Sequence, residues 1–371
     1  MCIRDSISPA YSLSGVPLAQ LRLAKSLGKI GHNVDLIYGC KKHSKIEKSP
    51  FIKIIFFNKF RVLGMFIPLV KYLIFNKPEV IFSAEDHLNA IVVLACIVTS
   101  SKAKISVSSR VTPIDTYRNS NINFSKGWFL KKLFPLVQSK ANLMTCVSKD
   151  MIKQYKKIFN KTNQVDVYNI VKTEESILKM KNKIEHKWFI NSKTQLIIAA
   201  GTLAPWKGFD DLIKAINILI KKKINLKLII IGDGPEKLSL NNLIKLYKIS
   251  NQVVILKPVM NTLKYFYNSN IFVLSSRLEG MPNVMIEAMM CGCTIVATDC
   301  PTGPREILGK NEYGYLAKVN NPNDLSANIM KAIKKKISAK KTKKILRQFT
   351  AEEVIKKQFL LLKIKRKYWM I

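Results

Sequence analysis

Short apolar runs alternate with helical patterns of hydrophobic residues along the first half of the chain. Such alternation is typical of a parallel sheet whose faces are covered by helices. The runs predict strands at Val34–Tyr38, Ile52–Phe57, Val80–Ser83, Lys104–Ser108 and Leu143–Val147. The patterns between them predict helices at Pro17–Ile30, Val62–Phe75, Leu88–Thr99 and Ser125–Ser139.

A second series of the same kind follows the polar, lysine-rich stretch 160–193. Its predicted strands are Gln195–Ala200, Lys227–Ile231, Val253–Lys257, Ile271–Ser275 and Thr294–Thr298. Its predicted helices are Asp210–Lys221, Lys237–Lys248, Asn261–Asn268 and Pro282–Cys291. We therefore expect two doubly wound α/β domains within the 371 residues, over 1–172 and 190–345. The basic, amphipathic tail predicts a C-terminal helix within 346–371 that crosses back to the first domain.

The first domain has no clear opening strand. A doubly wound domain begins with a buried strand that leads into a glycine turn. Ser14-Gly15 forms such a turn, and Ile3 and Ile7 are the aliphatic residues before it on which a strand could build. The pattern therefore indicates a first strand that is incomplete or poorly defined.

The chain carries a net charge of +38, from 62 Lys and Arg against 24 Asp and Glu. Three interpretations are open: nucleic-acid binding, attraction to an anionic membrane or phosphorylated substrate, and a compositional bias that solvates the surface. No recognition helix, zinc finger or aromatic RNA-binding signature accompanies the charge, so nucleic acid is not an expected partner. The stretches Phe56–Lys59 and Leu63–Lys77 fit either peripheral contact with an anionic membrane or core elements with exposed lysines.

Seven cysteines are scattered without the ligand spacing of a zinc site, which indicates a reducing compartment and buried thiols. No apolar run reaches the roughly 18 residues expected of a spanning helix. The start of the chain lacks the apolar segment of a secretory signal. We therefore expect a cytoplasmic protein, on the inner face of the plasma membrane if it contacts a membrane.

The densest candidate chemistry lies between Ser275 and Glu287. A predicted strand ends at Ser275, a short loop carries Glu279 and Gly280, and Pro282 can open the next helix. Ligands of open α/β sheets bind beyond the carboxyl ends of strands, and a helix N-terminus suits a diphosphate. Glu279 would then face sugar hydroxyls and Glu287 a ribose. The alternative is a pair of acids that merely favour a helix N-terminus.

Two further segments follow the ends of predicted strands. Gly201 opens the first, in which Lys207 is the cation placed to meet a phosphate, or else a solvated loop lysine. The second contains Gly232 and Gly234, which are either structural or make room for a nucleotide. It is not a full dinucleotide fingerprint, and hydride chemistry is therefore disfavoured.

With these segments in order, the chain resembles glycosyltransferase family 4, the retaining enzymes of the GT-B fold, over nearly its whole length. The resemblance implies two Rossmann-like domains with an interdomain cleft. Within the family, the chain is similar to transferases of bacterial surface-polysaccharide or lipid-linked oligosaccharide assembly. The residues that carry the resemblance are Ser14-Gly15, Gly31–Val34, Gly201 with Lys207-Gly208, Gly232–Pro235, Glu279–Asn283 with Glu287-Ala288, Ala297–Leu308 and Gly314–Leu316.

The resemblance implies a role for each matching residue. Lys207 would bind the donor diphosphate, Glu279 the donor sugar and Glu287 the ribose, with Lys207 and Glu279 counted as catalytic. The other expected donor-binding residues are Gly15, whose loop would close over the diphosphate, Gly201, Thr202, Arg277, Gly280, Met281, Pro282 and Asn283.

Two positions depart from the family pattern. Thr202 stands where the family usually has an arginine, so a second cation is needed, with Arg277 and Arg305 as candidates. No histidine lies in the stretch 106–111, where the family often has one near the reacting carbon. Arg110 could take its place as a catalytic residue, or form a surface or cross-domain ion pair. His87 could face the cleft or serve as a cap.

These features predict a hexosyltransferase that moves a sugar, with retention, from a UDP-linked donor to a glycan or polyprenyl-diphosphate-linked acceptor. Neither a metal nor a cofactor beyond the donor is expected, since no acidic triad suits a divalent ion. The alternatives are a sugar-nucleotide epimerase, a glycan phosphorylase and a non-catalytic nucleotide-sugar-binding module.

Overall fold

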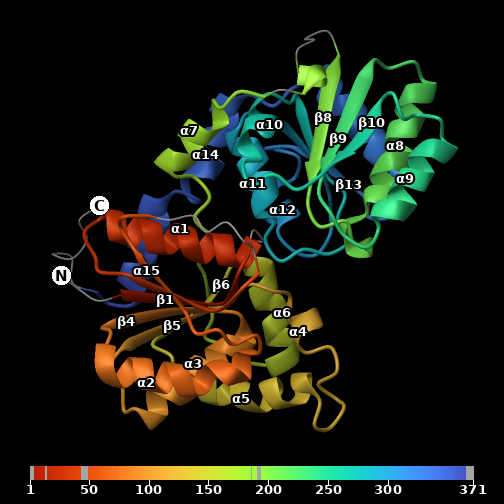
Figure 1. The fold of residues 1–371 in the computed structure, drawn as a ribbon. Coiled ribbons are helices and arrows are strands. Elements are labelled where there is room, and N and C mark those ends of the chain that lie inside the picture. The colour runs from red at the N-terminus through yellow and green to blue at the C-terminus, as the bar shows by residue number, and fades with distance from the viewer. Residues whose placement is uncertain (1–3, 13–14, 43–48, 185, 190–193, 365–371) are drawn as a thin grey trace. The chain divides into compact units, whose positions relative to one another are not determined.

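The computed structural model describes residues 4–12, 15–42, 49–184, 186–189 and 194–364 (Figure 1). The chain divides into two compact units. Unit 1 consists of Met1–Ile170 and Phe349–Ile371, and unit 2 of Val171–Gln348. The sequence placed the corresponding limits at 172 and 345, within a few residues of these divisions.

Unit 1 contains one parallel sheet of seven strands in the order β3-β2-β1-β4-β5-β6-β7. Its strands are β1 (Arg4–Tyr11), β2 (Asp35–Lys41), β3 (Lys53–Phe56), β4 (Val80–Ala84), β5 (Lys104–Ser109), β6 (Leu143–Cys146) and β7 (Val165–Asp166). Its helices are α1 (Gly15–Lys29), the 3-10 turn η1 (Val62–Met65), α2 (Phe66–Asn76), α3 (Asp86–Val98), α4 (Pro113–Thr116), α5 (Lys126–Lys140), α6 (Lys149–Phe159) and α15 (Ala351–Leu361).

The opening strand that the sequence left undefined is β1, and it lies at the centre of the sheet between β2 and β4. The prediction of an incomplete first strand is therefore wrong for the described residues; Ile3 and Ser14 lie outside them. The strand escapes a hydrophobicity pattern because it buries Arg4, Asp5 and Ser6 along with Ile7. Arginine and aspartate are among the residues least often buried, so they weigh against a strand in any sequence reading.

The C-terminal helix α15 belongs to unit 1 and packs against α1. Phe359 of α15 is fully buried, and the Arg4 guanidinium lies 4.1 Å from the centre of its ring. The predicted amphipathic stretch extended to Ile371, whereas α15 ends at Leu361 and residues 365–371 lie outside the described part. Helix α6 and strand β7 were not predicted, because they fall in or next to the lysine-rich stretch taken as a boundary.

Unit 2 contains a second parallel sheet, of six strands in the order β10-β9-β8-β11-β12-β13. Its strands are β8 (Gln195–Ala200), β9 (Leu226–Ile231), β10 (Val253–Leu256), β11 (Ile271–Leu274), β12 (Thr294–Thr298) and β13 (Tyr315–Ala317). Its helices are α7 (Glu174–Met180), η2 (Lys187–Phe189), η3 (Pro205–Lys207), α8 (Phe209–Lys221), α9 (Lys237–Leu246), α10 (Leu263–Tyr267), α11 (Asn283–Met290), α12 (Pro304–Leu308), α13 (Pro322–Lys334) and α14 (Ala339–Arg347).

The order of strands in unit 2 fixes where its loops meet. The chain moves outward from β8 to β9 and β10, and then returns to the other side of β8 with β11. The carboxyl ends of β8 and β11 therefore lie next to each other at the point where the strand order reverses, which is the usual ligand-binding place in such sheets. The segments beginning at Gly201 and Ser275 follow these two ends.

Candidate functional site

The loops after β8 and β11 are held together by backbone contacts. The Arg277 amide donates to Trp206 O (2.7 Å), and Ser275 Oγ donates to Lys207 O (2.9 Å). Gly208 makes this approach possible, because a Cβ at its position would lie 2.2 Å from Ser275 O. It also has φ +60°, a conformation that glycine adopts without strain. The predicted site residues 201–208 and 275–287 are therefore brought to one place.

Lys207 and Glu279, predicted separately from the two loops, form an ion pair. Lys207 Nζ lies 2.6 Å from Glu279 Oε1, and the side chains are 19% and 9% exposed. Ser276 Oγ donates to the same oxygen at 2.6 Å. A charge-assisted pair at this depth is well ordered, and its two members can be contacted together by a ligand that enters from the carboxyl edge. Sequence reasoning missed Ser276, although it stands in the same motif.

The loop that carries Glu279 and Gly280 is fixed by the segment after β12. Thr302 Oγ1 donates to the carbonyl oxygens of Glu279 (2.8 Å) and Gly280 (2.5 Å), and the Glu279 amide donates to Pro301 O (2.8 Å). A Cβ on Gly303 would lie 2.7 Å from Pro282 Cδ. From the sequence, this segment of the family motif had no predicted role apart from that of Arg305 as a candidate cation; the structure shows that the segment supports the candidate site.

The helix after the loop begins one residue later than predicted. α11 starts at Asn283, and Pro282 occupies the capping position with φ −77° and ψ 79°. The Asn283 amide donates to Met281 O (2.9 Å), and the Met285 amide donates to Pro282 O (2.9 Å). Glu287 lies on α11 and is 9% exposed. It is the fifth of the eight residues of this helix, and its role as the ribose-binding residue stays a prediction.

Gly201 and Thr202 line the same edge from the β8 side. A Cβ on Gly201 would make only ordinary contacts, with Phe209 Cζ at 3.7 Å and Lys207 Cε at 3.8 Å. The fold therefore does not require glycine here for lack of space. Thr202 is exposed and brings no charge, which leaves the predicted need for a second cation in place.

The two arginines proposed as that second cation are already paired. Arg277 Nη2 contacts Asp211 (2.7 Å) and Asp210 (2.9 Å) at the start of α8. Arg305 donates through Nε to Asp299 (2.9 Å). Both guanidinium groups therefore join loops of unit 2, and a diphosphate would have to compete with carboxylates for them. Asp210 and Asp211 could have been found from the sequence, because two acids open a predicted helix there, but no pattern indicated Arg277 as their partner.

Arg110 and Gly15 belong to unit 1, where both lie at the carboxyl ends of strands. Arg110 follows β5 and donates to Gln20 Oε1 on α1 (2.9 Å) and to Ser108 Oγ (3.3 Å). Its Nη1 is buried and has no hydrogen-bond partner within the described residues. Burial lowers the pKa of Arg110 to about 10, against the opposing charge of Glu85, so the group is a cation at neutral pH. Gly15 is the exposed first residue of α1.

His87 pairs with a residue that the sequence did not single out. Its Nε2 lies 3.2 Å from Glu85 Oε2. Burial, followed by the charge of Lys126, lowers the pKa of His87 to about 4, so the imidazole is neutral at pH 7. Burial raises the pKa of Glu85. Glu85 has φ 78°, a strained conformation for a residue with a side chain, and such outliers often occur at functional sites.

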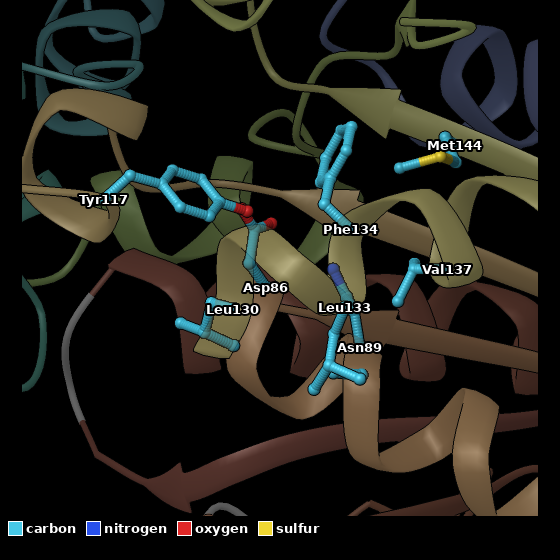
Figure 2. A pocket seen from close by; sticks show the side chains of 9 residues that line it. Asp86, Asn89, Tyr117, Leu130, Leu133, Phe134, Val137 and Met144 are labelled. Atoms are coloured by element: carbon cyan, nitrogen blue, oxygen red, sulfur yellow. The ribbon is translucent and has the colours of Figure 1, made fainter. Parts of the chain in front are cut away.

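A small cavity of unit 1 lies beside Asp86 (Figure 2). Asp86 accepts hydrogen bonds from Ser109 (2.6 Å), Tyr117 (2.7 Å) and Tyr155 (2.5 Å), and Figure 2 shows the Tyr117 hydroxyl directed at its carboxylate. The cavity volume is about 10 Å³, and most of its other lining is apolar, which leaves space for roughly one water molecule. It is too small for a substrate, and Asp86 acts there as a buried acceptor that joins three elements.

Metal and disulfide chemistry find no support in the described ranges. There, no group of three or more His, Cys, Asp or Glu side chains is placed to hold a metal ion. The six cysteines that the structure describes are buried free thiols. Burial, followed by the charge of Glu287, raises the pKa of Cys291 to about 12, so this thiol near α11 is not a nucleophile at neutral pH.

Several known proteins are similar to this chain. The model of the family described as "Glycosyl transferases group 1" matches residues 180–349. An uncharacterized glycosyltransferase of Methanocaldococcus jannaschii is 30% identical over 295 residues, which cover 72% of this chain and 70% of that protein. The N-acetylgalactosamine-N,N'-diacetylbacillosaminyl-diphospho-undecaprenol 4-alpha-N-acetylgalactosaminyltransferase of Campylobacter jejuni is 29% identical over 287 residues, 76% of this chain and 70% of that one.

Among solved structures, Anabaena HepE in complex with UDP and glucose superposes with a TM-score of 0.72 at 16% identity, over 98% of this chain and 100% of that one. This likeness shows the fold, which is GT-B. The family match covers the unit that contains Lys207, Glu279 and Glu287. The chain belongs to the group 1 glycosyltransferase family.

Proposed function

We propose that this protein is a retaining glycosyltransferase of family 4 that transfers a hexose from a UDP-sugar to a hydroxyl of a glycan or polyprenyl-diphosphate-linked acceptor. Its place is the cytoplasmic assembly of a bacterial surface polysaccharide, such as lipopolysaccharide. The observation that carries the proposal is the Lys207–Glu279 pair, 2.6 Å apart beyond the carboxyl ends of β8 and β11. One member suits a phosphate and the other a sugar hydroxyl.

The names of two similar proteins support the choice of substrates. HepE was solved with UDP and glucose, and the Campylobacter relative is named for a diphospho-undecaprenol acceptor. The exposed Thr202 and the paired Arg277 indicate that Lys207 provides most of the charge that a UDP diphosphate would meet.

In the proposed reaction, the bond between the anomeric carbon and the β-phosphate oxygen breaks while the acceptor oxygen bonds to the same face of that carbon. The acceptor proton passes to the leaving phosphate, so UDP leaves with it and no protein base is needed. Lys207 stabilises the charge that develops on the diphosphate, which is the type of interaction that lowers such barriers most. Glu279 orients the sugar, and Glu287 the ribose.

The test combines a donor screen with two substitutions. Thermal shifts with UDP-, GDP- and ADP-sugars should select UDP. Lys207→Met and Glu279→Gln should then each lower kcat/KM for transfer by about 100-fold or more. Lys179→Met is the matched control, since Lys179 forms a 2.8 Å pair with Glu175 on α7 of the same unit. It should stay within about twofold of the wild type, as expected for an exposed pair.

Wild-type rates in both site variants, with folding intact, would refute the site assignment. Transfer that inverts the anomeric configuration, measured by NMR of the product, would refute retention. Release of an epimerised sugar nucleotide, or of a sugar phosphate from added phosphate, would favour the epimerase or the phosphorylase.

A further inference from the structure

The strand order of unit 1 also reverses, and Glu85 stands at the point where it does. The chain moves outward from β1 to β2 and β3, and then returns to the other side of β1 with β4. Glu85 is the residue that follows the carboxyl end of β4. In unit 2, the corresponding place holds Lys207 and Glu279. A carboxylate of unit 1 therefore lies where a sheet of this kind usually binds a ligand.

The backbone of Glu85 has a conformation that favours glycine. Its φ is 78° and its ψ 130°, a combination that residues with a side chain rarely adopt. Hydrogen bonds on both sides hold it there. The Glu85 amide donates to Ser108 O (3.0 Å), and the Glu85 carbonyl oxygen accepts from the amides of Leu88 (3.0 Å) and Asn89 (2.9 Å). Glycine would fit this turn with less strain, so a glutamate here indicates a use for its side chain.

One oxygen of the Glu85 carboxylate is open to a ligand. The side chain is 21% exposed, and Oε2 lies 3.2 Å from Nε2 of the neutral His87. Among the residues that the structure describes, Oε1 has neither a hydrogen bond nor an ion pair. A partly buried carboxylate has lost some of its water and gains from a new hydrogen-bond donor. A hydroxyl group that reaches Oε1 would supply one.

Three cations act on this carboxylate from a longer distance. Burial raises the pKa of Glu85, and the charges of Lys126, Arg110 and Lys42 oppose this rise. These cations come from the start of α5 and from the segments after β5 and β2. They favour the ionised form of Glu85 without pairing with it in the described part of the chain. An ionised carboxylate accepts hydrogen bonds from hydroxyl groups strongly and repels a phosphate, so the ligand that it suits is a sugar.

We propose that Glu85 binds the acceptor sugar, by accepting a hydrogen bond at Oε1 from a hydroxyl next to the one that reacts. The inference rests on the proposed function, in which the acceptor is a glycan and the leaving phosphate takes the proton of the reacting hydroxyl. Glu85 therefore does not act as a base. It orients the acceptor ring, and its loss should weaken the binding of the acceptor while that of UDP stays unchanged.

The test is saturation-transfer NMR of the full chain in the presence of UDP. The probes are the p-nitrophenyl α-glycosides of glucose, galactose, N-acetylglucosamine and N-acetylgalactosamine, and the wild type should bind at least one of them. Glu85→Gln keeps the size of the side chain but replaces a charged acceptor with a neutral one. It should weaken the binding of that glycoside about tenfold, and calorimetry should give the wild-type affinity for UDP.

Glu85→Gly separates a role in binding from a role in folding. Because glycine adopts a positive φ without strain, this variant should raise the melting temperature by about 2 °C or more, and yet weaken glycoside binding at least as much as glutamine does. Glu79→Gln is the matched control, since the exposed Glu79 precedes the opposite end of the same strand. It should change the binding of neither the glycoside nor UDP.

The outcomes distinguish this inference from the proposed function. If UDP binds, but Glu85→Gln keeps the wild-type affinity for the glycoside or the wild type binds none of the four, the role of Glu85 is refuted and the proposed function stands. A lower melting temperature of Glu85→Gly would also refute it, because the carboxylate would then serve the fold. Failure of the wild type to bind UDP would refute the proposed function, and this inference with it.

Discussion

Replacing Gly208 with alanine should destabilise unit 2, because the added methyl group has no space. A Cβ at this position would lie 2.2 Å from Ser275 O. The Ser275 carbonyl cannot move away freely, because two hydrogen bonds hold its loop. Ser275 Oγ donates to Lys207 O (2.9 Å), and the Arg277 amide donates to Trp206 O (2.7 Å). Relief of the clash must therefore separate the two loops that bring Lys207 to Glu279.

Two costs add in this variant. The backbone has φ +60°, and a side chain in this left-handed conformation costs about 1–2 kcal/mol. Forcing an extra carbon against a packed backbone costs a further 1–3 kcal/mol or so. The free energy of unfolding should fall by about 2–5 kcal/mol in total.

Gly292→Ala separates the two costs. Gly292 also has a positive φ, +91°, but nothing lies within 4 Å of the position that its Cβ would take. This variant should lose only the backbone cost of about 1–2 kcal/mol. The difference between the variants then measures how tightly the loops are joined.

Urea denaturation followed by circular dichroism gives both free energies of unfolding. Hydrogen exchange of peptides that cover 205–208 and 271–277 tests where the loss occurs, and exchange there should accelerate in Gly208→Ala alone. Equal destabilisation by the two substitutions would show that the close approach of Gly208 to Ser275 contributes nothing, and the account of how the site is assembled would fail.

Asp86 yields the remaining predictions. Asp86→Ala should lower the free energy of unfolding by about 3 kcal/mol, because the hydroxyls of Ser109, Tyr117 and Tyr155 lose their buried acceptor; Asp86→Asn, which keeps an acceptor, should cost less than half as much in the same urea assay. Because burial raises the pKa of Asp86 above its ordinary 3.8, despite hydrogen bonds that oppose the shift, the folded protein holds this proton more tightly than the unfolded chain. The stability of the wild type relative to Asp86→Asn should therefore fall as the pH rises from about 4 through the folded-state pKa, and a difference that grows with pH would contradict this assignment.

The pattern of apolar residues was sufficient to predict those strands of both sheets that are uniformly apolar. Gln195–Ala200 and Thr294–Thr298 have the predicted bounds, because a strand buried on both faces reads as a continuous hydrophobic run. β1 is equally buried but contains Arg4 and Asp5, and its place in the sheet depends on pairing with β2 and β4. Such pairing is a tertiary property that a local pattern does not contain.

The same limit applies to the candidate site. Residue types at strand ends identified Lys207 and Glu279 as separate candidates, but their 2.6 Å contact follows from the adjacency of β8 and β11, which are far apart in sequence. For Arg277, the sequence motif suggested a contact that the structure does not show. Its position in the motif suggested a phosphate ligand, whereas its contact with Asp211 depends on how α8 packs beside the loop.

The Lys207–Glu279 contact predicts opposite effects of Glu279→Gln on two ligands. Without a ligand, the ammonium group is held by the carboxylate, so under the proposed function a diphosphate must draw Lys207 away from Glu279. Glutamine removes this competing charge, and UDP alone should therefore bind to Glu279→Gln as tightly as to the wild type or more tightly. A UDP-sugar also needs Glu279 for its hydroxyl groups, and should lose about tenfold in affinity when a charged acceptor becomes a neutral one. Calorimetric titration of the wild type and of Glu279→Gln with each ligand measures the direction in which each affinity changes. Equal weakening of UDP and UDP-sugar would mean that Glu279 only positions Lys207, and the division of labour between phosphate and sugar would have to be abandoned.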